Sequence, residues 1–359
     1  MSSSFGKNLK ITLFGQSHSH GLGVVIDGLP AGEEIDLSEI GAWLKRRQGG
    51  QKSYTTARAE SDELQILSGL VENRTCAAPL CAVFTNQNVR SEDYATFVRE
   101  PRPSHVDYVA LTKYGGSADL RGGGHFSGRL TLPICFAGAI CAQILQRRGI
   151  TVGAHIASIG EIKDQPYDPV RLTEEELKAA REKEFPVNDH NAGSLMVDGI
   201  SQAQKQGDSL GGIVECAALG LPVGVGEPFF DGLESRLSAA LFAIPAVKGV
   251  EFGSGFTATK MRGSEHNDAF YYLGEKIQTY TNHAGGIIGG LSTGMPLVVR
   301  VAFKPTASIA LEQDTVNLAT RQNTKLKITG RHDPCIAVRA VPCVEAVTSL
   351  VLLDLLLQK

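Results

Sequence analysis

The stretch LPICFAGAICAQILQRR, residues 132–148, decides the fold class. It is rich in alanine and glycine, it is apolar almost all round, and Gly149 follows its two closing arginines. A helix without a continuous polar face packs between other layers, because it has no side to turn to water. The stretch therefore predicts a central helix with other elements on both of its sides.

Strand-like runs occur on either side of this helix along the chain. Residues 9–14 alternate apolar and polar side chains and 24–26 is a β-branched run, so we predict two strands joined by a loop at 15–21. Further strand-like runs lie at 82–85, 213–219, 296–303 and 325–328. The fold class is therefore mixed α and β.

A capping signal marks another helix. Asp36 followed by Glu39 predicts a helix that ends near Gly49 and carries Arg46 and Arg47 in its last turn. Two other helices are expected, a charged and solvated one over 173–185 and an apolar one over 344–357. No linker, low-complexity tract or repeat divides the sequence, so we expect 1–359 to form a single catalytic domain.

Composition excludes several classes of protein. Apolar residues make up 42% and charged residues 20% of the 359, which excludes a disordered or fibrous chain, and the net charge of −3 argues against a nucleic-acid partner. The sequence begins without an apolar leader and has no run near ~18 apolar residues, so we predict a cytoplasmic protein with no membrane partner. The seven cysteines are odd in number and include no CxxC pair, which favours reduced core residues over a zinc site or a disulfide framework.

Four loops combine glycine or proline with charged or proton-carrying side chains. They are GQSHSHG (15–21), RPSHVDY (102–108), RGGGHFSGR (121–129) and GRHDPC (330–335). Such loops let backbone N–H groups approach an anion, and arginine offers a planar fork that suits phosphate or carboxylate. The pattern favours a site for a phosphorylated or carboxylated small molecule.

Each loop also has a simpler interpretation. The loop at 121–129 matches no nucleotide fingerprint, so its glycines are equally explained by a tight turn. His18 and His20 lack a third ligand at metal spacing, so we predict no metal site. His105 taken alone, or His283 in NHAGGIIGG, is equally consistent with a surface residue or a turn cap. Neither Ser127, which lacks a nucleophile elbow, nor Cys335 is a strong candidate nucleophile.

Taken together, ten ordered blocks resemble the chorismate synthase family over nearly the whole chain. They are FGQSH (14–18), DGLPAG (27–32), KRRQGG (45–50), ILSG (66–69), RPSHVDY, RGGGHFSGR, IPAVKGVEFGSGF (244–256), NHAGGIIGG (282–290), KPTASI (304–309) and GRHDPCIAVRAVPCVEA (330–346). The sequence departs from the usual family pattern at Gln16, Ser19, Ser53, His125, Phe126, Gly128 and Leu130.

The resemblance implies a fold, a reaction and a cofactor. The fold is an α+β, β-α-β sandwich with a central helical layer between two antiparallel sheets, usually assembled as a homotetramer. The reaction is a carbon–oxygen lyase step on a phosphate, the anti-1,4-elimination of phosphate from 5-enolpyruvylshikimate 3-phosphate that gives chorismate. It requires reduced FMN without net oxidation. Because the sequence has no nicotinamide fingerprint, we expect an external source of reduced flavin.

By resemblance, site roles fall on residues of the matched blocks. His18 is expected to protonate the leaving phosphate, His105 to protonate the flavin, and Asp333 to assist removal of the ring hydrogen. Substrate contacts are expected from Ser17, Arg46, Arg47, Arg129 and Arg339. Flavin contacts are expected from His125, Phe126, Ser127, Pro245, Ala246, Gly289, Lys304, Pro305, Thr306, Ala307, Ser308 and Arg331.

Two other functions stay open at this stage. One is a flavin-dependent oxidoreductase, which the missing dinucleotide signal disfavours. The other is a catalytically weakened, ligand-binding relative, suggested by the altered loop at 121–129. The presence of His18, His105, Arg129 and Asp333 argues for the enzyme.

Overall fold

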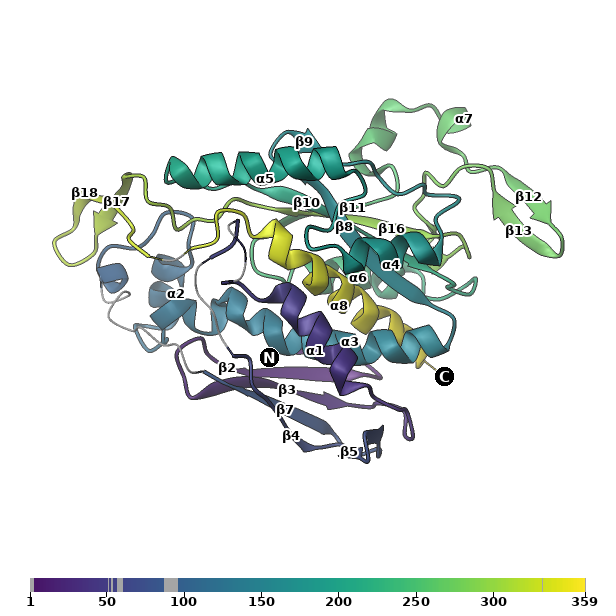
Figure 1. Ribbon diagram of the computed structural model, residues 1–359, viewed down its shortest axis with the longest axis horizontal. Coiled ribbons are helices and arrows are strands. Elements are labelled where there is room, and N and C mark those ends of the chain that lie inside the picture. Colours follow the sequence, from purple (N-terminus) through teal and green to yellow (C-terminus); the bar gives the residue numbers. More distant parts are fainter. Residues whose placement is uncertain are drawn as a thin grey trace.

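The computed structural model describes residues 3–50, 52, 54–56, 61–86, 96–330 and 332–358. Two five-stranded sheets enclose a layer of helices, as Figure 1 shows. Every strand pair within the two sheets is antiparallel. This arrangement confirms the expected α+β sandwich.

The first sheet is built from the N-terminal part of the chain. Its strands follow the order β1 (Ser4–Phe5), β2 (Lys10–Gly15), β3 (Gly21–Asp27), β7 (Leu80–Thr85) and β4 (Leu64–Ser68). In the central strand β3, the inward-facing Leu22, Val24 and Ile26 are fully buried. Because alternate residues of a strand share one face, this sheet buries one face against the helical layer. The small hairpin β5 (Leu70–Val71) and β6 (Arg74–Thr75) extends from its edge.

The second sheet is covered on both faces. Its strands follow the order β11 (Val247–Phe252), β16 (Leu297–Phe303), β10 (Gly212–Leu219), β8 (Thr151–Ile159) and β9 (Ile162–Lys163). The helices α4 (Glu174–Glu182) and α5 (His190–Lys205) contact its outer side, and α5 runs along the top of Figure 1. Coverage on both faces explains why β8 and β10 are buried almost continuously, without the alternation of β2.

The helical layer consists of α1 (Leu37–Arg47), α3 (Thr131–Arg147), α6 (Leu233–Leu241) and α8 (Ala337–Leu356). The helix α3 packs on the first sheet and α8 packs on the second. A Cβ atom at Gly138 of α3 would lie 2.3 Å from the Cβ of Ala346 on α8, so glycine is what lets the two helices approach so closely. Among the described residues, the stretch 121–147 is long and apolar enough to cross a membrane, but it lies inside this protein, as the central-helix prediction requires.

Buried carboxylates tie the layers together. Glu345 of α8 accepts two hydrogen bonds from Arg46, at 2.6 and 2.9 Å, and one from the backbone N–H of Ala154 on β8. Asp354, near the end of α8, accepts hydrogen bonds from the backbone N–H groups of residues 7, 8 and 9 and from Arg236 of α6. A buried charge is stable only when it is paired and hydrogen-bonded, and both carboxylates meet that condition.

Several elements differ from the sequence expectation. The helix α8 begins at Ala337 instead of near 344 and carries Pro342 inside it, although proline usually marks a helix boundary. No sequence signal predicted α5. The last predicted strand, 325–328, is β18 (Gln322–Leu326), which pairs with β17 (Gln313–Asn317) outside both main sheets. All seven cysteines are free, but Cys76 is exposed at the surface.

Several shorter elements lie outside the two main sheets. The hairpin of β12 (Phe270–Leu273) and β13 (Lys276–Thr279) projects from the molecule at the upper right of Figure 1, next to α7 (Gly263–His266). The hairpin of β14 (Ile287–Ile288) and β15 (Leu291–Ser292) is shorter. The helix α2 (Asp107–Lys113) lies at the opposite end of the molecule, near β17 and β18.

Candidate active site

A cavity of about 520 Å³ opens where the loops between the layers converge. Its wall combines the loop after β2, the C-terminal end of α1, the loop before α2, the glycine-rich turns before α3, the segment after β16 and the start of α8. Most predicted site residues line this cavity, namely His18, Arg47, His105, Phe126, Ser127, Arg129, Pro245, Ala246, Lys304, Pro305, Thr306, Ala307, Ser308, Asp333 and Arg339. The folding of the chain therefore brings together residues from all four loops that the sequence singled out.

Gly122 lies directly against His18 and Ser17. Its φ is +61°, and a Cβ atom there would lie 2.6 Å from both the Nε2 of His18 and the Oγ of Ser17. A side chain at this position would therefore clash with both, quite apart from the strain of the left-handed backbone. Ser17 is fully buried and does not itself line the cavity, and its Oγ has no hydrogen-bond partner among the described residues. A buried hydroxyl without a partner is costly, so this atom is suited to bind a ligand group.

His105 is held by a buried arginine–aspartate pair. Its Nδ1 lies 2.7 Å from Oδ1 of Asp107. Nη2 of Arg102 donates to the same Oδ1, and Nε of Arg102 donates to Oδ2, each at 2.8 Å. Burial alone would raise the pKa of Asp107, but the hydrogen bonds from Arg102 and His105 outweigh it and hold that pKa well below its usual range. The ionised carboxylate fixes the proton on Nδ1, so Nε2 is the nitrogen that faces Gly123 and the cavity.

Three arginines make the cavity basic. Arg47 donates to the hydroxyl of Thr131 at 3.0 Å and lies 3.7 Å from the carboxylate of Asp62, which Arg129 also contacts. Arg339 donates to the backbone carbonyl of Arg47 at 2.8 Å. Burial, followed by the positive charge of Arg339, lowers the pKa of Arg47. Crowded, desolvated guanidinium groups of this kind gain from the entry of an anion.

Asp333 is already engaged on both of its oxygens. Oδ1 accepts a hydrogen bond of 2.8 Å from the backbone N–H of Thr56, and Oδ2 accepts one from Arg339. The backbone carbonyl of the same residue accepts from the Thr306 hydroxyl at 2.7 Å. These contacts orient the carboxylate at the cavity wall beside the Arg339 guanidinium.

Another part of the cavity lining is less charged. It includes Ile244, Pro245, Phe303 and Phe126 together with the backbone of 304–308. Lys304 belongs to the same part of the lining. Its backbone N–H donates to the carbonyl of Ala246 at 3.0 Å, and its side-chain ammonium contacts the carbonyl of Ser104. Burial, and then the charge of Lys248, lowers the pKa of Lys304. Apolar surface with backbone polar groups and one cation suits a flat ring that carries a phosphate.

Some predicted residues lie elsewhere. Arg46 pairs with Glu345 and lines a separate cavity of about 230 Å³. The His125 ring contacts Ser3 Oγ and the carbonyl of Gly15, and Gly289 lies in the turn between β14 and β15. None of these three lines the larger cavity. Arg331 and Ser53 fall outside the described residues.

Other cavity residues escaped the sequence reasoning. Arg102 lines the cavity and Asp107 holds it in place, and the order Arg-x-x-His-x-Asp inside the block RPSHVDY was the signal for this cluster. Asp62 and Cys343 also line the cavity, but no local pattern marks them because they reach it through contacts distant in sequence. Among the described residues, no cluster of three His, Cys, Asp or Glu side chains is arranged to hold a metal ion.

Comparison with known proteins identifies the family. The family model for chorismate synthase matches residues 9–357. The chain belongs to the chorismate synthase family. Its relatives include the chorismate synthase of Dehalococcoides mccartyi strain BAV1, 49% identical over 100% of this chain and 97% of the relative, and that of Korarchaeum cryptofilum, 44% identical over 98% and 96%. A solved crystal structure of chorismate synthase superposes with a TM-score of 0.76 at 29% identity, covering 98% of this chain and 93% of that one.

Membership of the chorismate synthase family makes this protein an enzyme of the lyase kind in aromatic biosynthesis. It confirms the family resemblance drawn from the ten sequence blocks. The departures in the glycine loop are compatible with the family fold. His125 faces away from the cavity, and Phe126 lines it with an aromatic ring.

Proposed function

We propose that this protein converts 5-enolpyruvylshikimate 3-phosphate to chorismate by anti-1,4-elimination of phosphate, with reduced FMN bound and no net oxidation. The observation that carries the proposal is the convergence of His18 and His105 on one basic cavity. An elimination that expels phosphate needs cations for a multiply charged substrate and proton donors at two places. The cavity supplies both.

The arginine side of the cavity is proposed to hold the substrate. Arg47, Arg129 and Arg339 present three guanidinium groups against the two carboxylates Asp62 and Asp333, so this part of the lining carries a net positive charge that attracts an anionic substrate. The buried hydroxyl of Ser17 offers a hydrogen bond next to His18. Because His18 lies beside a bound phosphate, its protonated form is favoured, which keeps a proton ready for the leaving group.

The less charged part of the lining is proposed to hold reduced FMN. Phe126, Ser127, Pro245, Ala246 and the segment 304–308 are the residues that would surround it. The reduced flavin would supply electron density that allows phosphate and a ring hydrogen to leave without net redox change. His105, with Nδ1 fixed by Asp107, holds or passes a proton at Nε2, while the Asp333 carboxylate, which also lines the cavity, accepts a proton.

We also propose that the chain works as one catalytic domain in a homotetramer in the cytoplasm and takes its reduced flavin from an external source. One hydrophobic core runs through both sheets and the helical layer, which supports a single folding unit. Large exposed apolar side chains support association, among them Phe230 at 93% exposure and Tyr272 of the β12–β13 hairpin at 75%. Light scattering on the purified protein tests the tetramer, and a monomer at micromolar concentration would contradict it.

The decisive experiment is anaerobic phosphate release from 5-enolpyruvylshikimate 3-phosphate. We expect release with chemically reduced FMN, no release with oxidised FMN plus NADPH, and no stoichiometric consumption of the reduced flavin. Efficient release in air with NADPH, FMN and no added reductase would contradict the external flavin source. Net oxidation of the flavin with each turnover would favour an oxidoreductase instead.

A further inference from the structure

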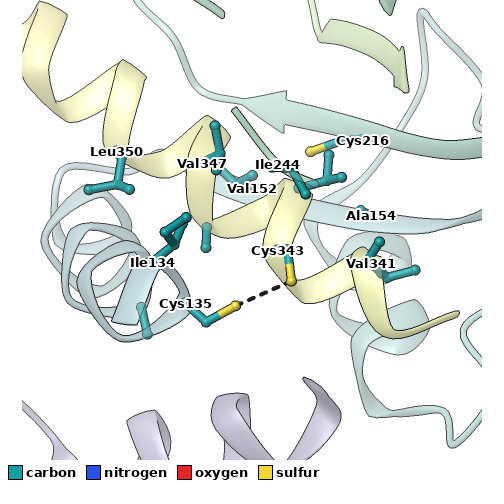
Figure 2. Close-up of a cluster of buried hydrophobic side chains, with 14 of the residues drawn as sticks. Ile134, Cys135, Val152, Ala154, Cys216, Ile244, Val341, Cys343, Val347 and Leu350 are labelled. Carbon is teal, nitrogen blue, oxygen red and sulfur yellow. Dashed lines mark hydrogen bonds between the residues drawn. The ribbon is translucent and has the colours of Figure 1, made fainter. Parts of the chain in front are cut away.

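Two cysteines meet where the central helices pack, and one of them reaches the cavity. Cys135 of α3 donates a hydrogen bond to Cys343 of α8 across a sulfur–sulfur distance of 3.6 Å, drawn as the dashed line in Figure 2. Both side chains are buried, and Cys343 also lines the large cavity. Small solutes that enter the cavity can therefore reach one thiol of the pair.

Helix packing keeps the two sulfurs together. Gly138 and Ala346 lie three residues after Cys135 and Cys343 on their helices, and at that point the backbones are close enough to exclude any side chain at 138. The sulfurs, 3.6 Å apart, need to approach by only about 1.5 Å to reach a disulfide length of ~2.05 Å. Side-chain rotation rather than helix separation can supply most of this movement.

The surroundings shift the pKa values of the two thiols in opposite directions. The hydrogen bond from Cys135, with the nearby positive charges of Arg47 and Arg339, lowers the pKa of Cys343 below its usual value despite its burial. Burial raises the pKa of Cys135 well above its usual value. Since the thiolate is the reactive form, Cys343 is the nucleophile that attacks the oxidant. Cys135 is the resolving thiol, which reacts afterwards with the oxidised Cys343.

We propose that Cys343 is an oxidation site on the cavity wall and that Cys135 converts the oxidised form into a disulfide between α3 and α8. In the first step the Cys343 thiolate attacks hydrogen peroxide, one oxygen transfers to sulfur, and the O–O bond breaks to give a sulfenic acid and, after protonation, water. In the second step the Cys135 sulfur displaces that hydroxyl as water and forms the S–S bond. The two sulfurs together lose two electrons, and the peroxide is reduced to two molecules of water.

The oxidant has a natural source if the proposed function holds. Reduced flavins release hydrogen peroxide in air, so a flavin enzyme would generate the oxidant next to Cys343. Only this source depends on the proposed function, because the oxidation site itself needs nothing but peroxide. Disulfides in cytosolic proteins are usually transient, which fits a reversible response.

The test uses the full-length protein without flavin or substrate, so its outcome is independent of the proposed reaction. The fully reduced protein is treated with stoichiometric hydrogen peroxide at pH 7.5 and then analysed by intact mass and non-reducing peptide mapping. We expect a Cys135–Cys343 cross-link that dithiothreitol reverses, and a formation rate that rises with pH as more of the Cys343 thiolate forms. Cys343 that stays reduced while other thiols oxidise would overturn the proposal.

Two variants separate the roles of the cysteines. In Cys135→Ser the sulfenic acid at 343 has no partner, so we expect dimedone to label that position, whereas the parent protein is labelled little. Cys141→Ser is the matched control, because Cys141 lies on the same helix, is equally buried and contacts no second thiol among the described residues. It should form the cross-link at the parent rate. Equal dimedone labelling of the parent and Cys135→Ser would refute Cys135 as the resolving thiol. If a variant fails to fold, peptide mapping of the parent protein still shows whether the Cys135–Cys343 disulfide forms.

Discussion

Replacing Asp107 with asparagine tests whether the buried Arg102–His105–Asp107 cluster positions the cavity histidine. The carboxylate is 1% exposed and accepts four hydrogen bonds, three from Arg102 and one from His105. An amide has a single acceptor oxygen, so its NH₂ group must face one of these donors. Arg102 then loses a buried counter-charge, and breaking such a pair costs about 3–5 kcal/mol.

We expect Asp107→Asn to lower the free energy of unfolding by about 3 kcal/mol, the low end of that range, because Arg102 keeps its bond to Ser308. Turnover should fall by roughly 10²-fold or more, with a smaller change in KM, because the proton on Nδ1 is no longer fixed and Nε2 is no longer reliably presented to the cavity. Urea unfolding and anaerobic phosphate release measure the two effects separately.

The pH dependence gives a third observable. Since the pKa of Asp107 is lowered on folding, its ionised form contributes stability that is present above its unfolded pKa, ~3.9, and is lost as the pH falls toward the folded value. Asp107→Asn should therefore weaken the loss of stability below about pH 4. Asp119→Asn is the matched control, because Asp119 pairs with Arg121 near the surface, where such pairs are worth ~0–1 kcal/mol. A folded Asp107→Asn protein that keeps half of its turnover would refute the positioning role.

The other predictions concern the cavity walls and the helix contact. His18→Ala and His105→Ala should each lower turnover by roughly 10²-fold or more in a folded protein, whereas His20→Ala, exposed and outside the cavity, should have little effect; stopped-flow turnover with a circular-dichroism check decides this. Asp333→Asn should reduce single-turnover elimination by ~10-fold or more while substrate affinity, measured by titration, stays equal or tightens slightly, and a loss of affinity alone would make Asp333 a structural residue. Gly138→Ala should destabilise the protein by about 1–3 kcal/mol in chemical unfolding, and an unchanged midpoint would mean that the two central helices can move apart.

The sequence predicted the central layer well because its signal is local. The apolar stretch at 132–148 is α3 (Thr131–Arg147), shifted by one residue at each end, and the Asp36 signal is a true N-cap, whose side chain accepts from the N–H groups of residues 38 and 39. The helix α5 was missed because His190–Lys205 mixes polar residues with two glycines, and its burial against the second sheet, which the sequence does not show, stabilises it. The first turns of α8 were missed because Pro342 usually marks a helix boundary. Tertiary packing keeps these turns helical in spite of the proline.

The candidate site was also predicted only in part, because the direction of a side chain and its long-range contacts are not visible in a local pattern. Arg46 and Arg47 are adjacent in the sequence, so they point about 100° apart on a helix, and only Arg47 reaches the cavity while Arg46 turns to Glu345. Family motifs predicted which loops meet, but not which member of a motif faces inward. Asp62 carries no local signal at all, because its role depends on Arg47 and Arg129 arriving from two other elements.

The attachment of the chain's beginning to its end has a consequence during synthesis. Asp354 supplies the carboxylate that holds the backbone of residues 7–9 at the start of the first sheet, and α8 covers the apolar face of α3. On the ribosome, both features arrive last. Until α8 emerges, α3 has no partner on one side and the first strands have no anchor, so the nascent chain exposes the apolar side chains of α3. The sandwich therefore cannot close until α8 has left the ribosome, and chains truncated before Asp354 should be recovered bound to chaperones or in aggregates.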